Sequence, residues 1–284
     1  MAQPDTYAHC EALVRAADKD HYLASLFAPM PARQHLHALY AFASEIARVR
    51  EAAREPLPGE IRLQWWRDVL EGEGRGEVSA NPIAAALLDT IGRCALPTAR
   101  LIALIDAHAF DLYDEAMPCV ADLDAYAEHT SGTLFGLAAQ ILGGADGADA
   151  IAAAAVSAGI AYGVAQRLRT FPRDLARRQL FVPLDLMAQH GVTREEIGVR
   201  QNTAALRSVL AALRDHARAA YGRFRLAVPS IPEACAPALL VAALAPLLLA
   251  RLEAAAADPF ASVEVPQWRR QWALWRAARR WPVV

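Results

Sequence analysis

The sequence lacks paired cysteines, long uninterrupted apolar runs and a large net charge, and each absence argues against a class of protein. Its four cysteines are far apart and form no CxxC pair, which argues against a disulfide framework and against zinc. A reducing compartment fits this usage, so we expect a cytoplasmic protein. The formal net charge of −2 leaves no basic footprint for nucleic acid, which we exclude as a partner.

Neither an export signal nor a membrane span is predicted. The opening MAQPDTYAHCEALVRAADKD mixes charges and holds no apolar run, unlike a signal peptide. The longest apolar run, residues 234–250, is interrupted by Pro237 and Pro246 and is shorter than the roughly 20 residues that a membrane-spanning helix needs. We therefore expect this run to be a buried helix.

What the sequence does contain is helical periodicity. Apolar residues make up 55% of the chain, many of them alanine, which favours closely packed helices. No stretch alternates with the two-residue period of a strand. No internal segment is rich enough in Gly, Ser or Pro to be a linker. We predict an all-α protein with one domain over residues 1–284.

Start and stop signals divide the chain into about ten helices. Pro31 begins a helix that continues through YAFASEIARVRE, residues 40–51, and EPLPGE at 55–60 ends it. Asn81 followed by Pro82 caps another helix. Capping boxes are predicted at Thr193 with Glu196 and at Ser230 with Glu233. Long helices are predicted near 97–115, 122–143 and 150–171, with a further pair across 202–254.

Three carboxylates in FDLYDE form the first candidate site. Asp111, Asp114 and Glu115 stand at i, i+3 and i+4, which would place them on one face of a helix. Such a face could hold Mg²⁺, which prefers oxygen ligands. The alternative interpretation is a solvated acidic helix end.

A basic run after two glycines forms the second candidate. Gly159 and Gly163 lie four residues apart, which allows another helix to approach closely. The arginines that follow are Arg167, Arg169, Arg173, Arg177 and Arg178. Guanidinium groups at this density suit a phosphate or another anion, because the planar fork binds two oxygens at once. The alternative is a solvated basic loop paired with Asp174.

The C-terminal QWRRQWALWRAARRW forms the third candidate. Trp268, Trp272 and Trp275 fall on one side of a helix, and arginines that include Arg269 and Arg276 occupy the neighbouring sector. Such a basic amphipathic helix could lie in a membrane interface or bind a partner. The alternative is that the tryptophans dock the last helix on the domain.

Two further features predict packing rather than chemistry. In the segment around QWWR, residues 64–67, Leu63, Trp66 and Leu70 share a helix face. The scattered histidines, among them His21 and His108, show no HExxH arrangement, so we interpret each as structural.

In order and spacing, several segments resemble the squalene and phytoene synthase family over nearly the whole chain: HYLASLFAP, ALYAF, AYAEHTSGTLFGLAAQILG, GIAYGVAQRLR with FVP, and ALAPLLLARL. The resemblance implies an isoprenoid-synthase-like helical bundle around a central apolar cavity. Members condense two prenyl diphosphates, and two aspartate-rich motifs hold the Mg²⁺ that neutralises the departing diphosphate.

Both motifs depart from the family pattern here. Aligned from Tyr40, the three aspartates of the first motif fall on Ala47, Arg48 and Glu51. Aligned from Gly159, the two aspartates of the second fall on Thr170 and Asp174, its asparagine falls on Gln166, and its arginine is kept as Arg169. An arginine in place of an aspartate repels Mg²⁺ by several kcal/mol in a poorly solvated cavity.

GEIRLQWWRD and the degenerate first motif are most similar to the branch typified by a mitochondrial assembly factor for respiratory complex I. That resemblance implies a role in assembling or equipping a membrane complex, with a peripheral position at the inner membrane.

Three hypotheses follow. In the first, the metal centre is dismantled and the cavity binds an isoprenoid-like ligand or serves assembly of a respiratory complex, with no certain cofactor. In the second, an active prenyl transferase has rebuilt a Mg²⁺ site from Glu51, Asp111, Asp114, Glu115 and Asp174, with Arg48 and Arg169 on the diphosphate. In the third, the chain is a scaffold whose C-terminal helix docks on a membrane or a subunit.

Overall fold

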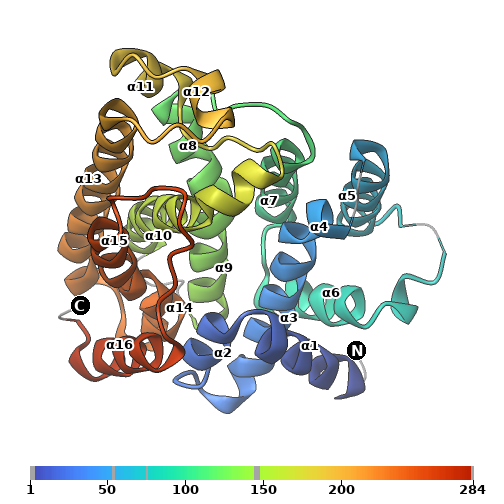
Figure 1. The fold of residues 1–284 in the computed structure, drawn as a ribbon. Helices are drawn as coiled ribbons and strands as arrows, with labels where there is room; N and C mark the ends of the chain where they lie inside the picture. The colour runs from blue at the N-terminus through green and yellow to red at the C-terminus, as the bar shows by residue number, and fades with distance from the viewer. Residues whose placement is uncertain (1–3, 53–54, 75, 144–147, 283–284) are drawn as a thin grey trace.

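The computed structural model describes residues 4–52, 55–74, 76–143 and 148–282, and these form helices joined by turns, without a strand (Figure 1). The all-α prediction is confirmed. The first half contains α1 (Pro4–Ala17), α2 (Lys19–Ser25), α3 (Met30–Ala47), α4 (Val49–Ala52), α5 (Pro56–Glu71), α6 (Pro82–Cys94), α7 (Thr98–Ala109) and the short η2 (Phe110–Leu112). The second half contains α8 (Val120–Ala127), η3 (Glu128–Gly132), α9 (Thr133–Ile141), α10 (Ala148–Ala176), α11 (Leu184–Gln189), α12 (Arg194–Gly198), α13 (Ala204–Ala227), α14 (Ala236–Leu239), η6 (Leu240–Leu244), α15 (Ala245–Ala254) and α16 (Gln267–Arg280).

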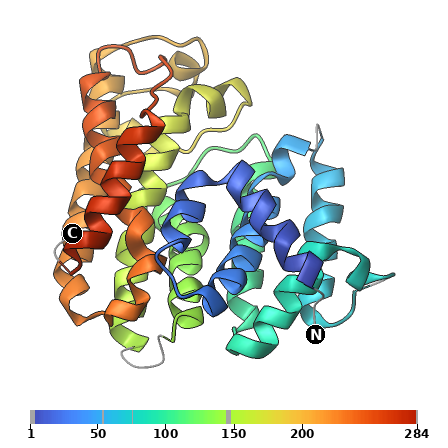
Figure 2. The same ribbon diagram turned by 90° about the horizontal axis from the view of Figure 1, so that it is seen from below.

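Helix α10 is the centre of the fold. It packs along α13 on one side and against α8, η3 and α9 on the other (Figure 1). Helices α1, α3 and α6 pack together as a second group, which meets the first where α3 contacts α9. Figure 2 shows these two groups from below, with α13, α15 and α16 at one end and α5 and α6 at the other. The cavity described below lies between the groups.

Two glycines allow α10 to lie against the η3 segment. A Cβ atom on Gly159 would stand 2.5 Å from the Cα and the backbone nitrogen of Gly132, and one on Gly163 would stand 2.9 Å from the Cβ of Ala127. Any side chain at these two positions would force the backbones apart. The close helix approach predicted from the glycine spacing is confirmed.

The η3 segment is a single π-helical turn between α8 and α9. The three elements together form the long helix predicted near 122–143. A π turn inserts one extra residue into an α-helix and is common at functional sites. Here it directs Thr130 and Ser131 to the cavity.

The helix that begins near Pro31 ends earlier than predicted. It ends at Ala47, Arg48 takes the C-cap position, and the four-residue α4 follows. The proline-rich EPLPGE begins the next helix rather than ending this one, because Pro56 fills the first turn of α5, where no N–H is needed. Arg48 and Glu51 therefore stand at a helix junction.

Two of the predicted caps are confirmed and one is wrong. Asn81 accepts hydrogen bonds from the N–H groups of Ile83 and Ala84, and Thr193 forms the capping box with Glu196. Ser230 is not the cap, because it ends the 3₁₀ turn η4 (Val228–Ser230), and Pro232 takes the N-cap position of the next 3₁₀ turn, η5 (Glu233–Cys235).

The apolar run at 234–250 is buried as predicted, but it is not one helix. Pro237 and Pro246 each stand in the first turn of a new segment, α14 and α15, with η6 between them. Two stretches of the described chain, Ala148–Ala176 and Glu233–Ala254, are long and apolar enough to cross a membrane. More than half of the most apolar part of each is buried inside the fold, as in core helices of soluble proteins.

We expect Gly159→Ala to lower the free energy of unfolding by about 2 kcal/mol, because the new methyl group would press on the backbone of Gly132. Gly222→Ala in α13 is the matched control, since its Cβ would meet nothing within 4 Å. It should raise stability by about 0.5–1 kcal/mol through helix propensity. Urea unfolding followed by circular dichroism measures both variants. Equal effects would contradict the tight packing.

Candidate functional site

A cavity of about 280 Å³ opens between the two helix groups. Its walls come from α2, α3, α7, α8, η3, α9 and α10, so residues far apart in the sequence meet there. Ala43, Ala47, Leu104 and Leu134 supply apolar wall. The cavity predicted from the family resemblance is therefore present, with an apolar side and a strongly basic side.

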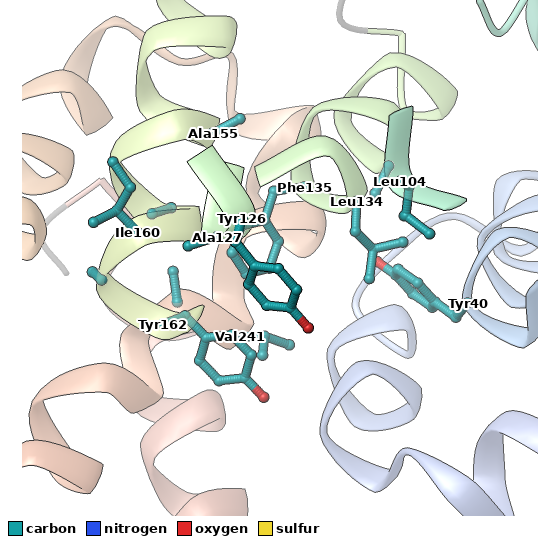
Figure 3. Close-up of a cluster of buried hydrophobic side chains, with 14 of the residues drawn as sticks. Tyr40, Leu104, Tyr126, Ala127, Leu134, Phe135, Ala155, Ile160, Tyr162 and Val241 are labelled. Atoms are coloured by element: carbon teal, nitrogen blue, oxygen red, sulfur yellow. The ribbon is translucent and has the colours of Figure 1, made fainter. Parts of the chain in front are cut away.

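Two tyrosines, Tyr126 and Tyr162, also line the cavity. Figure 3 shows their hydroxyl oxygens directed toward the space between the helix groups. Burial raises the pKa of both phenols above the usual value, and nearby carboxylates raise it further. Both hydroxyls therefore stay protonated and act as neutral hydrogen-bonding groups.

Four arginines line the basic side: Arg48, Arg167, Arg169 and Arg173. The side chains of Arg48 and Arg173 are 61% and 52% exposed, so they stand at the mouth. Arg167 is only 25% exposed, and its guanidinium lies 4.6 Å from the centre of the Phe181 ring. Packing on this ring holds Arg167 in place, because the cation is attracted to the aromatic face.

Arg169 is the arginine best suited to bind a ligand. Its Nε donates to Oε1 of Gln166 at 2.7 Å, and it forms no ion pair with a carboxylate of the described chain. Burial, together with the nearby Arg270 and Arg173, lowers the pKa of Arg169. A guanidinium remains charged after such a shift. An anion beside Arg169 would relieve the repulsion that lowers this pKa.

One buried acid–base pair also lines the cavity. Oδ2 of Asp18 lies 2.7 Å from Nδ1 of His21, and the His21 side chain is 6% exposed. Burial works against both charges, yet each partner favours the charged form of the other: the pKa of Asp18 is lowered and that of His21 is raised. Both shifts favour the ion pair, in which His21 offsets the negative charge of Asp18.

Glu51, the one candidate metal ligand left in the first motif, is surrounded by arginines. Its carboxylate lies 3.6 Å from Arg48, 3.8 Å from Arg173 and 3.1 Å from Arg177. These contacts join α4 to α10 across the cavity mouth. A divalent cation at Glu51 would have to displace them.

Asp174, the candidate from the second motif, is equally engaged. Its side chain is 4% exposed, accepts a hydrogen bond from the Thr170 hydroxyl at 2.6 Å, and lies 3.6 Å from Arg167 and 3.7 Å from Arg173. Thr170 takes the place of the first aspartate of this motif, and its hydroxyl donates a hydrogen bond to Asp174, which is the second. The predicted alternative, a solvated basic loop paired with Asp174, is right about the pairing, but Arg167, Arg169 and Arg173 lie in helix α10 rather than in a loop.

The shared helical face predicted for Asp111, Asp114 and Glu115 is wrong. Helix α7 ends at Ala109, Asp111 lies in the 3₁₀ turn η2, and the backbone is extended from Tyr113. Buried Asp111 accepts a hydrogen bond from Tyr126 at 3.0 Å and pairs with His108 at 2.7 Å.

The other two acidic residues of that segment point elsewhere. Asp114 lies 3.4 Å from Arg50, and Glu115 is exposed. None of the three carboxylates lines the cavity.

These contacts decide whether the residues fit Mg²⁺. Among the described residues, no group of three or more His, Cys, Asp or Glu side chains is placed to hold a metal ion. Asp18 is the one carboxylate among the cavity-lining residues, and it faces His21. A dication beside four guanidinium groups would meet repulsion of several kcal/mol. The donor set suits an anion and does not suit Mg²⁺.

Sequence reasoning found part of this site. Arg48, Gln166 and Arg169 line the cavity, as do Arg167 and Arg173 of the basic run. Asp18, His21, Tyr126 and Tyr162 were missed. The segments HYLASLFAP and AYAEHTSGTLFG hold His21 and Tyr126 and carry the family resemblance, but no spacing rule links them to α10.

The C-terminal candidates Trp268, Arg269, Trp272, Trp275 and Arg276 do not line this cavity. They lie on α16, where the three tryptophans are exposed, while Leu274 and Ala277 are buried against the domain.

Comparison with known proteins places this geometry in context. The family model for squalene/phytoene synthase matches residues 14–276. The NADH dehydrogenase (ubiquinone) complex I assembly factor 6 of Rattus norvegicus is 33% identical over 207 residues, which are 73% of this chain and 62% of the rat protein. The match thus spans less than two thirds of that relative. Phytoene synthase of Thermus thermophilus is 30% identical over 214 residues, 74% of this chain and 70% of that enzyme.

Solved structures agree on the fold. A dehydrosqualene synthase solved with a ligand superposes with a TM-score of 0.79 at 20% identity, covering 97% of this chain and 96% of that one. At this identity the likeness establishes the shared helical architecture. Taken with the family match over almost the whole sequence, it shows that the chain belongs to the squalene/phytoene synthase family.

Proposed function

We propose that this protein binds an anionic, isoprenoid-like ligand without a metal ion, and that it serves the assembly of a respiratory membrane complex. The observation that carries the proposal is the basic side of the cavity. Four arginines line it, and Glu51 and Asp174, the carboxylates that remain from the two motifs, are engaged by other groups.

The arginines can neutralise the charge of a diphosphate, which a metal ion does in other members of the family. Arg169 and Arg48 lie on opposite walls of the cavity, on α10 and at the end of α3. Guanidinium groups form bidentate, charge-assisted hydrogen bonds with phosphate oxygens. The apolar wall of Leu104 and Leu134 would accommodate a hydrocarbon tail. The ligand is thus an amphiphile with a phosphate-like head.

Binding of this kind does not by itself lead to ionisation. Loss of diphosphate requires the leaving group to be stabilised more strongly in the transition state than in the bound ligand. The buried Tyr162 hydroxyl stays protonated and could donate a hydrogen bond to the bound head group, whereas the Tyr126 hydroxyl already donates to Asp111. Neither hydroxyl adds a positive charge. We therefore propose a binding protein rather than a prenyl transferase.

The assembly role is supported by the relatives. A complex I assembly factor of rat matches 73% of this chain at 33% identity. The proposal includes a cytoplasmic location, peripheral to the inner membrane, with a subunit of the respiratory complex as the protein partner.

We expect farnesyl thiolodiphosphate, a non-ionisable analogue, to bind with the same Kd within about twofold in EDTA and in Mg²⁺. Arg169→Gln and Arg48→Gln should each weaken binding about 10-fold or more, as expected for loss of a charge-assisted hydrogen bond. Arg62→Gln, on the exposed face of α5, is the matched control and should leave Kd unchanged. Isothermal titration calorimetry gives these constants, and neutral farnesol tests the contribution of the head group.

Binding that requires Mg²⁺ would count against the proposal. So would turnover of farnesyl or geranylgeranyl diphosphate with Mg²⁺ or Mn²⁺ at an ordinary enzymatic rate, which would favour the transferase alternative.

The assembly role is tested separately. Membranes of the source organism lacking this gene should show reduced NADH:ubiquinone oxidoreductase activity and less assembled complex on native gels. Wild-type protein should restore both, and so should Arg62→Gln. The double variant Arg48→Gln/Arg169→Gln should fail to restore them if the cavity serves assembly. Normal complex levels in the deletion strain would contradict the role.

A further inference from the structure

Helix α16 combines a docking face with a strongly basic composition. Leu274 and Ala277 are 1% and 6% exposed and hold the helix against η6 and α2. The remaining positions include five arginines, and the helix contains no acidic residue. One of the five, Arg270, is neutralised by Asp20 of α2 at 2.9 Å. The others are exposed.

The outer side of α16 carries a row of tryptophans. Trp268, Trp272 and Trp275 are 64%, 54% and 50% exposed, and their spacing of four and three residues places them along one stripe. Tryptophan is highly buried on average in folded proteins. Three exposed indoles on one helix therefore form an apolar patch of the kind that marks an interaction surface.

Each of these indoles is accompanied by its own cation. Guanidinium carbons lie 5.2 Å from the Trp268 ring, 5.2 Å from the Trp272 ring and 5.1 Å from the Trp275 ring. The residues that provide them are Arg269, Arg276 and Arg279. A bilayer interface matches this arrangement, because indoles settle at the level of the head groups while guanidinium groups pair with lipid phosphates.

Charge distinguishes the bilayer from a second copy of the chain. A symmetric contact would bring the arginines of one α16 against those of the other, without an acidic side chain on either helix to offset them. An anionic membrane surface instead attracts every exposed arginine. More apolar side chains follow α2, the neighbour of α16: Leu26, Phe27 and Met30 are 41%, 44% and 73% exposed. Figure 1 shows α2 and α16 at the same lower edge of the molecule.

We propose that α16 docks the protein on a membrane that contains anionic lipid, with Trp268, Trp272 and Trp275 inserted among the head groups. This docking does not depend on the cavity ligand. Helix α2 connects the docking helix with the cavity, because Asp20 pairs with Arg270 of α16, and Asp18 and His21 line the cavity. Membrane docking would therefore also serve ligand binding if the proposed function holds. A lipid-like ligand would then meet the cavity close to the membrane surface.

The test is flotation of the purified full chain with vesicles of phosphatidylcholine containing 30% phosphatidylglycerol, and with vesicles of phosphatidylcholine alone. The wild type should float with the anionic vesicles at low salt, and 0.5 M NaCl should weaken the partitioning. Arg276→Glu/Arg280→Glu should lower the partition coefficient at least about 25-fold, because each arginine near an anionic surface is worth about fivefold. Trp268→Ala/Trp272→Ala/Trp275→Ala should lower it by a similar amount.

Matched control variants make the same kinds of substitution on other helices, so they show whether the loss of membrane binding is specific to α16. Arg62→Glu/Arg100→Glu makes the same change in charge on exposed positions of α5 and α7. Leu57→Ser/Ile61→Ser removes exposed apolar side chains, 62% and 63% exposed, from α5. Both should float almost as the wild type does. Thermal unfolding checks that every variant is folded.

Three outcomes would overturn the proposal. The first is a wild type that stays unbound, and the second is equal losses in the α16 variants and their controls. The third is a tryptophan variant that changes the sedimentation coefficient of the free protein but not its flotation, which would make α16 a self-association surface.

Discussion

Ion pairs between arginines and carboxylates beside the cavity are the interaction on which the arrangement of this site depends. In this structure Glu51 is held by three guanidinium groups and Asp174 by two together with a threonine hydroxyl. A carboxylate so engaged cannot also coordinate a hard cation without losing these ion pairs and the hydrogen bonds from Arg177 and Thr170. The same contacts tie α4 to α10. One set of ion pairs thus engages both carboxylates that remain from the two motifs.

The positively charged side chains on the basic side of the cavity are all arginines. The chain has 29 basic residues, and Lys19 is its single lysine. Guanidinium groups keep their charge throughout the physiological pH range, and their planar forks match phosphate oxygens. Arg167 also packs on Phe181, so its position is set by the core.

The fold and about half of the site could be predicted from the sequence because they rest on local patterns. Periodicity gave the all-α class, Gly159 with Gly163 gave the close approach to Gly132, and the arginine run gave much of the basic wall. The failures involve tertiary context. Helical spacing alone placed Asp111 with Asp114, whereas Asp111 is buried by its bonds to Tyr126 and His108 and the chain leaves the helix there. Nothing local indicates that His21 of α2 faces α10.

Because of the close contact between Gly132 and Gly159, one wall of the cavity is more rigid than the other. The wall formed by η3 and α10 is backbone against backbone, so it cannot yield without breaking helical hydrogen bonds. The opposite wall ends in the four-residue α4, joined to α10 by long, partly exposed arginines that exchange partners easily. A bulky ligand would therefore enter by displacing α4. The rigid wall formed by η3 and α10 would then limit which ligand shapes fit.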